Sequence, residues 1–314
     1  MSTKPKRIVV AVNPSASFGK GKHVGPAVIT SLRAMGHEVE PLIEQDYFSL
    51  VESGRKAVAT RPDALVVVGG DGMVNLGANL VAGTKVPLGI VPSGTGNDMA
   101  RGLGIPHENA EQAIRILADA LERKPRRIDA GRVTHADKTT GDPKQTWFAC
   151  LVSAGFDAIV NERANIWTYP KGPSRYNIAL VYELLRMKPI TYNLTMDGVK
   201  STFEASLITV ANNQSLGGGM KVTPNAKVDD GLLDVLIVQK LSRISFLRIF
   251  PRVYKGEHIT DRRVSITHAK HVIIEAEGIS ATADGETLGP LPLEIEVVPG
   301  ALLILAPLEA PSFS

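Results

Sequence analysis

Two short glycine-rich stretches carry most of the chemistry that this sequence suggests. Residues 69–72 read Gly-Gly-Asp-Gly, and residues 94–98 read Gly-Thr-Gly-Asn-Asp. Glycines permit positive φ angles and let backbone N–H groups approach an anion such as a phosphate. A carboxylate such as Asp71 would repel a bare phosphate, but it is a natural partner for a phosphate that arrives with Mg²⁺. Asp98 supplies a second acid, so the two stretches together predict a site for a metal-bound nucleotide.

Either stretch alone is weak evidence. Glycine-rich turns follow strands in many α/β proteins, and an Asp beside a Gly is often a turn residue or a helix N-cap. The sequence contains no Gly-x4-Gly-Lys-Ser/Thr loop, and Met99 breaks the dinucleotide-binding fingerprint at its last position. The P-loop and ordinary Rossmann interpretations are therefore weak, and the prediction depends on the two stretches occurring together.

The elements that must position these stretches are predicted from apolar runs. Each stretch follows an uninterrupted aliphatic run, at residues 64–68 and 89–92, that is typical of a buried parallel strand. The alternation of such runs with amphipathic segments predicts a doubly wound α/β fold, which binds ligands at the carboxyl ends of its strands. The other expected elements of this half are strands at residues 7–12 and 38–43 and helices at residues 24–35, 49–60, 75–82, 97–104 and 108–123.

The pattern changes after residue 127, where the chain becomes a series of short strand-like runs separated by turns. Their spacing, with few helices, predicts an antiparallel β-sandwich or barrel. The runs are residues 145–153, 190–196, 206–211, 233–239, 271–277 and 293–298. We therefore expect an α/β catalytic domain at residues 1–127 and a β-rich substrate domain at residues 128–299, with the active site in the cleft between them. Residues 300–308 are expected to return to the first domain.

The two glycine-rich stretches and the Asp-Gly-Glu at residues 284–286 resemble the diacylglycerol kinase catalytic family. These bacterial lipid kinases are related to sphingosine and ceramide kinases and, more distantly, to NAD kinases and phosphofructokinases. The resemblance spans the chain from Asn13 to Glu286. It implies transfer of the γ-phosphoryl group of ATP, with Mg²⁺, to a lipid hydroxyl, and diacylglycerol is the expected acceptor. One departure is Met73, where the family usually has Thr, so one hydroxyl that bonds a phosphate would be missing.

The resemblance also implies roles for individual residues. Asp284 would accept the proton of the acceptor hydroxyl, which is a weak nucleophile, and Glu286 would contact the nucleotide or the metal. Asp71 and Asp98 would organise the catalytic Mg²⁺. The expected nucleotide contacts are Asn13, Ser15, Gly69, Gly70, Asp71, Gly72, Met73, Asn75, Ser93, Gly94 and Thr95. Without the family, Asp-Gly between two strands is first of all a hairpin turn.

A second, structural Mg²⁺ site is implied by the resemblance at residues 227–232. Asp230 and the backbone carbonyls of Lys227 and Leu232 would hold this ion, with Asp129 in its second coordination shell. Hard cations need several oxygen ligands, and the local acids supply only some of them. A solvated acidic turn is the alternative interpretation of this stretch.

The composition is that of a globular protein, with 44% hydrophobic and 21% charged residues. A lone Cys150 excludes an intrachain disulfide and a cysteine-rich zinc site. No apolar run approaches the roughly 18 residues of a transmembrane helix. We therefore expect a cytoplasmic protein that reaches its lipid peripherally, at the inner face of the membrane. A formal charge of +3 is too small to indicate a nucleic-acid partner, and a homodimer is left open.

Two segments are candidates for contact with the membrane. Residues 241–263 alternate basic and apolar side chains, as in helices that lie on an anionic bilayer, but a helix packed on the β-rich domain with a solvated basic face would look the same. Residues 161–171, which include Trp167, and an expected helix at residues 174–186 would form a rim of the acyl-chain pocket or a plain surface loop.

Two other functions fit parts of the pattern. A kinase of a soluble acceptor, such as an NAD kinase, would share Gly-Gly-Asp-Gly but not the second stretch. A non-catalytic nucleotide or lipid sensor is suggested by Met73, and the intact Asp284 and Glu286 argue against it.

Overall fold

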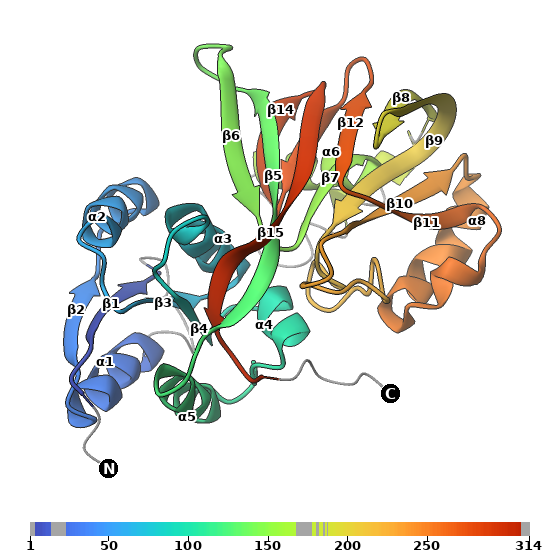
Figure 1. Ribbon diagram of the computed structural model, residues 1–314. Coiled ribbons are helices and arrows are strands. Elements are labelled where there is room, and N and C mark those ends of the chain that lie inside the picture. Colours follow the sequence, from blue (N-terminus) through green and yellow to red (C-terminus); the bar gives the residue numbers. More distant parts are fainter. Residues whose placement is uncertain are drawn as a thin grey trace. The chain divides into compact units, whose positions relative to one another are not determined.

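The computed structural model describes residues 4–13, 23–167, 178–179, 182–184, 186 and 188–308. The chain divides into two compact units (Figure 1). Unit 1 comprises Met1–Ala130 together with Pro299–Ser314, and unit 2 comprises Gly131–Val298. The chain passes from one unit to the other within two strands, β5 (Arg126–Ala136) and β15 (Leu293–Leu305).

Unit 1 is built on a parallel sheet in the order β15-β4-β3-β1-β2. Its strands are β1 (Arg7–Val12), β2 (Glu38–Leu42), β3 (Ala64–Gly69), β4 (Leu88–Pro92) and the end of β15. Every residue of β3 is buried, as expected for an aliphatic strand that is covered on both faces. The central strands are thus the ones with the longest unbroken aliphatic runs.

Helices cover both faces of this sheet. They are α1 (Val24–Ala34), α2 (Tyr47–Ala59), α3 (Asp71–Val81), α4 (Asp98–Leu103) and α5 (Ala110–Leu121). Figure 1 shows α2 and α3 on one face and α1 and α5 on the other. The Asp46 and Asn109 side chains cap α2 and α5 by accepting the N–H groups of Ser49 and Gln112. The predicted α/β fold of the N-terminal half is confirmed.

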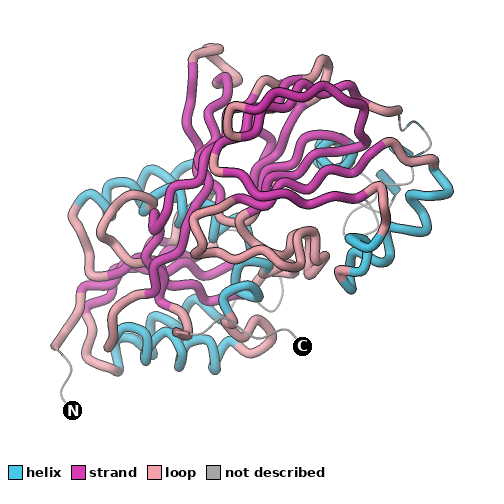
Figure 2. Tube along the Cα trace, turned by 45° about the vertical axis from the view of Figure 1, so that its right-hand side comes forward, coloured by secondary structure: helices cyan, strands magenta, loops and turns pink. Residues whose placement is uncertain are grey.

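Unit 2 consists mainly of antiparallel strands, which are magenta in Figure 2. They are β6 (Pro143–Phe148), β7 (Leu151–Gly155), β8 (Ile190–Met196), β9 (Val199–Ala211), β10 (Leu233–Gln239), β11 (Val264–Ala269), β12 (His271–Glu275), β13 (Ser280–Ala283) and β14 (Glu286–Pro290). The long β9 pairs with β8 through its first half and with β7 and β10 through its second half. A strand shared in this way joins two layers of a sandwich.

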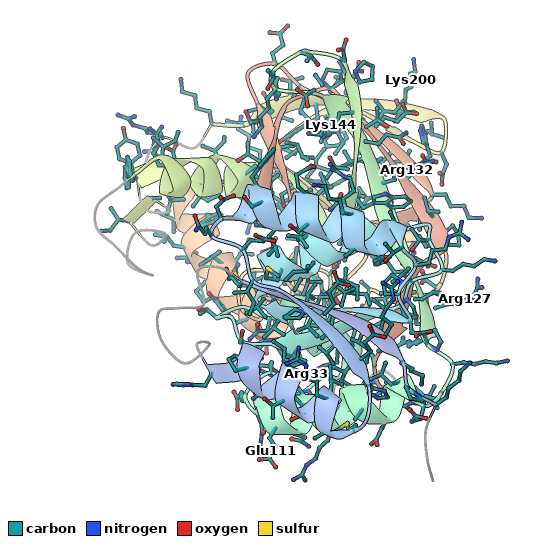
Figure 3. The ribbon with its side chains drawn as sticks, turned by 90° about the vertical axis from the view of Figure 1, so that its left-hand side faces the viewer. Arg33, Glu111, Arg127, Arg132, Lys144 and Lys200 are labelled. Atoms are coloured by element: carbon teal, nitrogen blue, oxygen red, sulfur yellow. The ribbon has the colours of Figure 1, made fainter. Side chains whose placement is uncertain are left out.

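The core of unit 2 is formed by the inward-facing residues of these strands. It includes the fully buried Phe148 and Tyr192, and the Tyr192 hydroxyl donates to the carbonyl of Ala154 at 2.9 Å. On the surface, Arg132 of β5, which is labelled in Figure 3, bonds Glu296 of β15 at 2.6 Å and lies over the ring of Trp147. The predicted β-sandwich class is confirmed for this half.

Some elements of unit 2 differ from the expectation. Helix α6 (Phe156–Ile166) occupies a stretch that was expected to be partly loop. It follows β7 directly through Gly155, whose φ is +140°, and no side chain caps it, so the usual start signal is missing. The basic stretch after residue 241 forms α8 (Arg243–Ile249) and two short 3₁₀ helices, η3 (Phe250–Lys255) and η4 (Glu257–Thr260). Most of the expected helix at residues 174–186 lies outside the described residues.

A buried histidine in η4 links the stability of unit 2 to pH. His258 is 2% exposed, its Nε2 bonds the carbonyl of Val222 at 2.9 Å, and its Nδ1 is buried without a hydrogen-bond partner among the described residues. Burial lowers the pKa of His258 below its ordinary value of 6.5, and the charge of Arg252 adds to this, whereas the bond to Val222 opposes it. The unfolded chain therefore takes up this proton more readily than the folded chain.

We expect the melting temperature to fall as the pH is lowered from 7.5 to 5.5, because the neutral form of His258 is the one that fits the fold. Replacing His258 with Gln keeps a donor for Val222 and removes the titration, so the fall should shrink by about 2 °C or more. Thermal melts at both pH values measure this difference. The exposed His23→Gln is the control, and equal falls in wild type and His258→Gln would contradict the assignment.

Candidate active site

The first glycine-rich stretch forms the junction between β3 and α3. Strand β3 ends at Gly69, Gly70 is the N-cap of α3 in an extended conformation, and Asp71 is the first residue of the helix. The sequence prediction started this helix at residue 75, which was wrong by four residues. Asp71 and Gly72 looked like turn residues, whereas an acid in the first turn suits the positive end of the helix dipole.

The second stretch forms the junction between β4 and α4. The Ser93 N–H donates to the carbonyl of Gly69 at 2.9 Å, so this stretch starts beside the first. Asn97 has a φ of +54°, and its side chain closes the turn by accepting the Gly94 N–H at 3.0 Å and donating to the Gly94 carbonyl at 2.9 Å. Helix α4 then begins at Asp98.

The two stretches touch through their glycines. A Cβ atom on Gly94 would lie 2.4 Å from the Cα atom of Gly70, and a Cβ on Gly96 would lie 2.3 Å from Oδ2 of Asp71. None of the glycines of the two stretches has a positive φ angle. The expectation that they serve positive φ is therefore wrong here. Close approach of two backbones accounts for Gly70 and Gly94, and close approach of the Asp71 carboxylate accounts for Gly96.

Two carboxylates meet at this contact. Oδ1 of Asp71 accepts the N–H of Asp98 at 2.7 Å. Oδ2 of Asp71 and Oδ2 of Asp98 both lie within 3.2 Å of the point that a Cβ of Gly96 would occupy. Ser93 Oγ is buried and has no hydrogen-bond partner in the part of the chain that the structure describes. Two neighbouring acids are suited to a cation, and an unsatisfied hydroxyl at the start of the same stretch is suited to an anionic ligand.

The other expected nucleotide contacts differ in their exposure. Gly94 and Thr95 are exposed, and Gly70, Asp71, Gly72 and Ser93 are half-buried. Gly69, Met73 and Asn75 are buried; the Met73 side chain packs against Gly69, and its N–H donates to the Gly70 carbonyl. The Asn13 N–H donates to the carbonyl of Val68 at the end of β3, and Ser15 lies outside the described residues. Nucleotide binding by this set stays a prediction.

In unit 2, Asp284 occupies a two-residue hairpin turn between β13 and β14. Asp284 and Gly285 have φ angles of +48° and +86°, which are typical of a type I′ turn. The Asp284 carboxylate is buried and accepts three backbone N–H groups. Oδ2 accepts that of Ala149 at 2.8 Å, and Oδ1 accepts those of Cys150 and Leu151 at 2.9 Å each. Glu286, the first residue of β14, is exposed.

This carboxylate explains why the expected strand at residues 145–153 is interrupted. The structure has β6 up to Phe148 and β7 from Leu151, with a bend at Ala149 and Cys150. The N–H groups of Ala149 and Cys150 point to Asp284 and so are not available to a strand ladder. The single-strand prediction was therefore wrong, and the bend is a feature of the site.

Sequence reasoning missed two asparagines that hold the bend from its other side. Asn212 and Asn213 are fully buried, and their N–H groups donate to the Cys150 carbonyl at 2.8 and 3.1 Å. The Asn212 side chain also donates to the Ala149 carbonyl at 3.3 Å. A signal was available, because two amides directly after an apolar strand must find buried partners.

The acidic turn at residues 229–234 is centred on Asp230, which is exposed and accepts the Leu232 N–H at 3.1 Å. Burial raises the pKa of Asp234 to about 6, against the effect of the nearby His268 and with a contribution from Asp230. No group of three or more His, Cys, Asp or Glu side chains that could hold a metal is found among the described residues. The Mg²⁺ site of Lys227, Asp230 and Leu232 relies on two carbonyls and stays a prediction.

Asp129, which was expected in the second coordination shell of that ion, belongs to unit 1. It is 3% exposed, and its Oδ1 accepts the N–H of Gly300 at 2.8 Å. The contact joins β5 to β15, so Asp129 has a structural role that does not depend on a metal.

Comparison with known proteins assigns each half of the chain to a known domain family. Residues 7–133 match the diacylglycerol kinase catalytic domain, and residues 150–306 match the YegS C-terminal NAD kinase beta sandwich-like domain. A diacylglycerol kinase of Mycobacterium tuberculosis is 38% identical over 302 residues, covering 96% of this chain and 95% of the relative. The chain belongs to the diacylglycerol kinase family.

Other members of the diacylglycerol kinase family align over most of the chain. A diacylglycerol kinase of Bacillus subtilis is 27% identical and covers 92% of each chain. Among solved structures, a putative diacylglycerol kinase from Bacillus anthracis superposes with a TM-score of 0.75 at 22% identity, covering 98% of this chain and 99% of the other. Yeast NADH kinase gives a TM-score of 0.56 at 12% identity, covering 96% and 83%. These two structures show the shared fold.

Membership of the diacylglycerol kinase family makes this protein a lipid kinase, with ATP as co-substrate and typically a divalent metal. The predicted family and enzyme class are confirmed. Within the described residues, no helix is both long and apolar enough to cross a bilayer.

Proposed function

We propose that this kinase transfers the γ-phosphoryl group of Mg²⁺-bound ATP to the hydroxyl of diacylglycerol and forms phosphatidic acid. The contact between the two glycine-rich stretches carries the nucleotide part of the proposal. It gathers the Asp71 and Asp98 carboxylates and the unsatisfied Ser93 hydroxyl at the carboxyl ends of β3 and β4, which is where α/β sheets bind ligands. The acceptor is proposed from the relatives that are named diacylglycerol kinase.

The residues at this contact fit a magnesium nucleotide. Mg²⁺ prefers carboxylate oxygens and phosphate oxygens. Asp71 and Asp98 offer two carboxylates next to Gly96 of the second stretch. When bound, the ion would neutralise the charge that develops on the transferring phosphoryl group. The Ser93 and Thr95 hydroxyls would donate to phosphate oxygens, and the N-terminus of α3 adds the positive end of a helix dipole.

The chemical step needs an acceptor for one proton. The hydroxyl oxygen of diacylglycerol forms a bond to the γ-phosphorus while the bond from phosphorus to the bridging oxygen of ADP breaks. We assign the hydroxyl proton to Asp284. Three backbone N–H donors hold this carboxylate in one position. Asn212 and Asn213 hold the bend that supplies those donors.

The experiment is a comparison of acceptors. The purified protein is incubated with ³²P-labelled ATP and Mg²⁺ in separate reactions with diacylglycerol, ceramide or sphingosine in neutral mixed micelles, and with soluble NAD. We expect labelled phosphatidic acid, and we expect EDTA to prevent its formation. Preferential labelling of NAD or of a sphingolipid would replace the proposed acceptor, and ATP binding without transfer to any of them would indicate a sensor.

A further inference from the structure

Helices α8 and η3 form a ridge in unit 2, defined here as residues 243–255. Its inner face is part of the core: Phe246 and Ile249 are buried against Leu236, Val238 and Val264 of β10 and β11. The Phe246 ring also meets that of Phe156 edge-on at 4.7 Å and stacks with Phe250 at 5.4 Å. The inner face therefore holds the ridge in place and accounts for its buried aromatic residues.

The outer face of the ridge is also apolar, although it faces solvent. Ile244 is 64% exposed, Leu247 57% and Tyr254 52%, and Pro251 is exposed as well. Their spacing of three, four and three residues places them along one side of a helical segment, opposite Phe246 and Ile249. Single exposed apolar residues are common on protein surfaces, but a continuous apolar line on a helix indicates a binding surface.

Basic residues flank this apolar line. Arg243, Arg248 and Lys255 are exposed, and none of them forms an ion pair with another described residue. Two nearby arginines differ, because Arg252 bonds the Glu257 carbonyl and Thr260, and Arg263 pairs with Asp261 at 2.9 Å. Arg252 and Arg263 thus hold local structure, whereas the three flanking cations are available to an anionic partner.

We propose that the ridge docks this kinase on an anionic phospholipid bilayer. The inference rests on the proposed lipid acceptor, which the protein must meet at a membrane surface. Ile244, Leu247 and Tyr254 would enter the boundary between headgroups and acyl chains, while the flanking cations contact lipid phosphates. The combination of an apolar line with cations on its edges matches a lipid surface, which offers apolar and anionic groups together.

The test is binding to vesicles of defined composition. Wild-type protein should sediment with vesicles that contain phosphatidylglycerol and phosphatidylcholine, and the bound fraction should fall with salt and with removal of phosphatidylglycerol. The double variant Arg243→Gln/Arg248→Gln should bind roughly 25-fold more weakly, because each basic residue near the surface contributes about fivefold. Leu247→Asn should weaken binding to the same vesicles even at high salt.

A matched control lies elsewhere in unit 2. Val199 is 72% exposed and is followed by the exposed Lys200 at the start of β9 (Figure 3). The double variant Val199→Asn/Lys200→Gln removes one apolar and one basic residue and should bind vesicles like wild type. Melting curves of all variants show that the fold is kept. Equal vesicle binding by wild type and the ridge variants, or no binding by wild type, would overturn the proposal.

Two further measurements separate docking from the proposed reaction. In neutral detergent micelles the ridge variants should phosphorylate diacylglycerol at the wild-type rate, and they should be slow only on anionic vesicles. Vesicle binding through the ridge without phosphorylation of diacylglycerol would support docking and reject the proposed acceptor. The ridge could instead bind a second copy of this chain, and sedimentation velocity tests this alternative. If the ridge variants turn a wild-type dimer into a monomer, the ridge joins two copies and membrane docking is rejected.

Discussion

Replacing Asp284 with asparagine is expected to reduce kcat about a thousandfold, because a neutral amide cannot accept the proton of the lipid hydroxyl. The assay is transfer of labelled phosphate to diacylglycerol at saturating ATP, well below the melting temperature of the variant. Under the same conditions the affinity for ATP should change little, because Asp284 is assigned to the acceptor side of the reaction.

The same substitution should also lower stability. An asparagine oxygen can still accept the N–H groups of Cys150 and Leu151, but its NH₂ group would face the Ala149 N–H, which the carboxylate now satisfies. A buried donor without an acceptor costs about 1–3 kcal/mol. We therefore expect a fall in melting temperature of several degrees, measurable by calorimetry, in addition to the loss of turnover.

Asp197 provides a matched control for this pair of effects. It precedes Gly198 in the β8–β9 hairpin, has a φ of +46°, and accepts the N–H groups of Lys270 and His271 through its side chain. Asp197→Asn can keep both bonds through its amide oxygen, so it should change the melting temperature little and leave kcat within about twofold of wild type. Retention of more than a tenth of wild-type turnover by Asp284→Asn, or a parallel loss in Asp197→Asn, would contradict the proposed role of Asp284.

The second large effect is expected for Gly94→Ala. The new methyl group would lie 2.4 Å from the backbone of Gly70, which cannot move unless the two glycine-rich stretches separate. Separation would displace Asp71 relative to Asp98, and displacement of a catalytic group by about 1 Å lowers activity roughly a hundredfold. We expect kcat/KM for ATP to fall by at least this factor, with a loss of about 1–3 kcal/mol in the free energy of unfolding.

Gly54→Ala tests whether crowding alone explains such a result. Its Cβ would lie 2.6 Å from the end of the Leu80 side chain, which can rotate away, and Gly54 is inside helix α2. The melting temperature should stay within about 3 °C and kcat/KM should be unchanged, because the helical preference of alanine offsets the adjustment. If Gly94→Ala behaved like Gly54→Ala in ATP titrations, the contact between the stretches would not be part of the nucleotide site.

Continuous aliphatic runs made the sheet of unit 1 predictable. The runs at residues 7–12 and 64–68 became β1 and β3 with at most one residue of difference, because strands covered on both faces need apolar residues at every position. Strand β11 was missed. Its Val264 and Ile266 alternate with polar residues, which is a strand pattern, but the strand directly follows the basic stretch and was not distinguished from it. Elements with weak local signals, such as α6, depend on packing that the local sequence does not record.

Candidate residues for the site could be named from the sequence, but their partners could not. Asp284 is joined to the bend at Ala149 and Cys150 across more than 130 residues, and nothing near either segment encodes that pairing. Glycines were singled out in both stretches, but the contact that requires glycine at positions 70 and 94, where the two backbones meet, was not foreseen. Contacts between distant segments are fixed by the completed fold, so sequence patterns can point to them only through family resemblance.

Strand β15 has a consequence for how the chain is synthesised. Its Ile304 and Leu305 pair with Leu88 and Gly89 of β4 in unit 1, and they are translated only after the whole of unit 2. Until then, the outer edge of β4 presents unpaired hydrogen-bonding groups, the kind of strand edge at which nascent chains associate wrongly. Maturation of unit 1 on the ribosome therefore waits for a segment more than 200 residues downstream. Ribosome stalling or premature termination late in the message would then compromise the beginning of the protein.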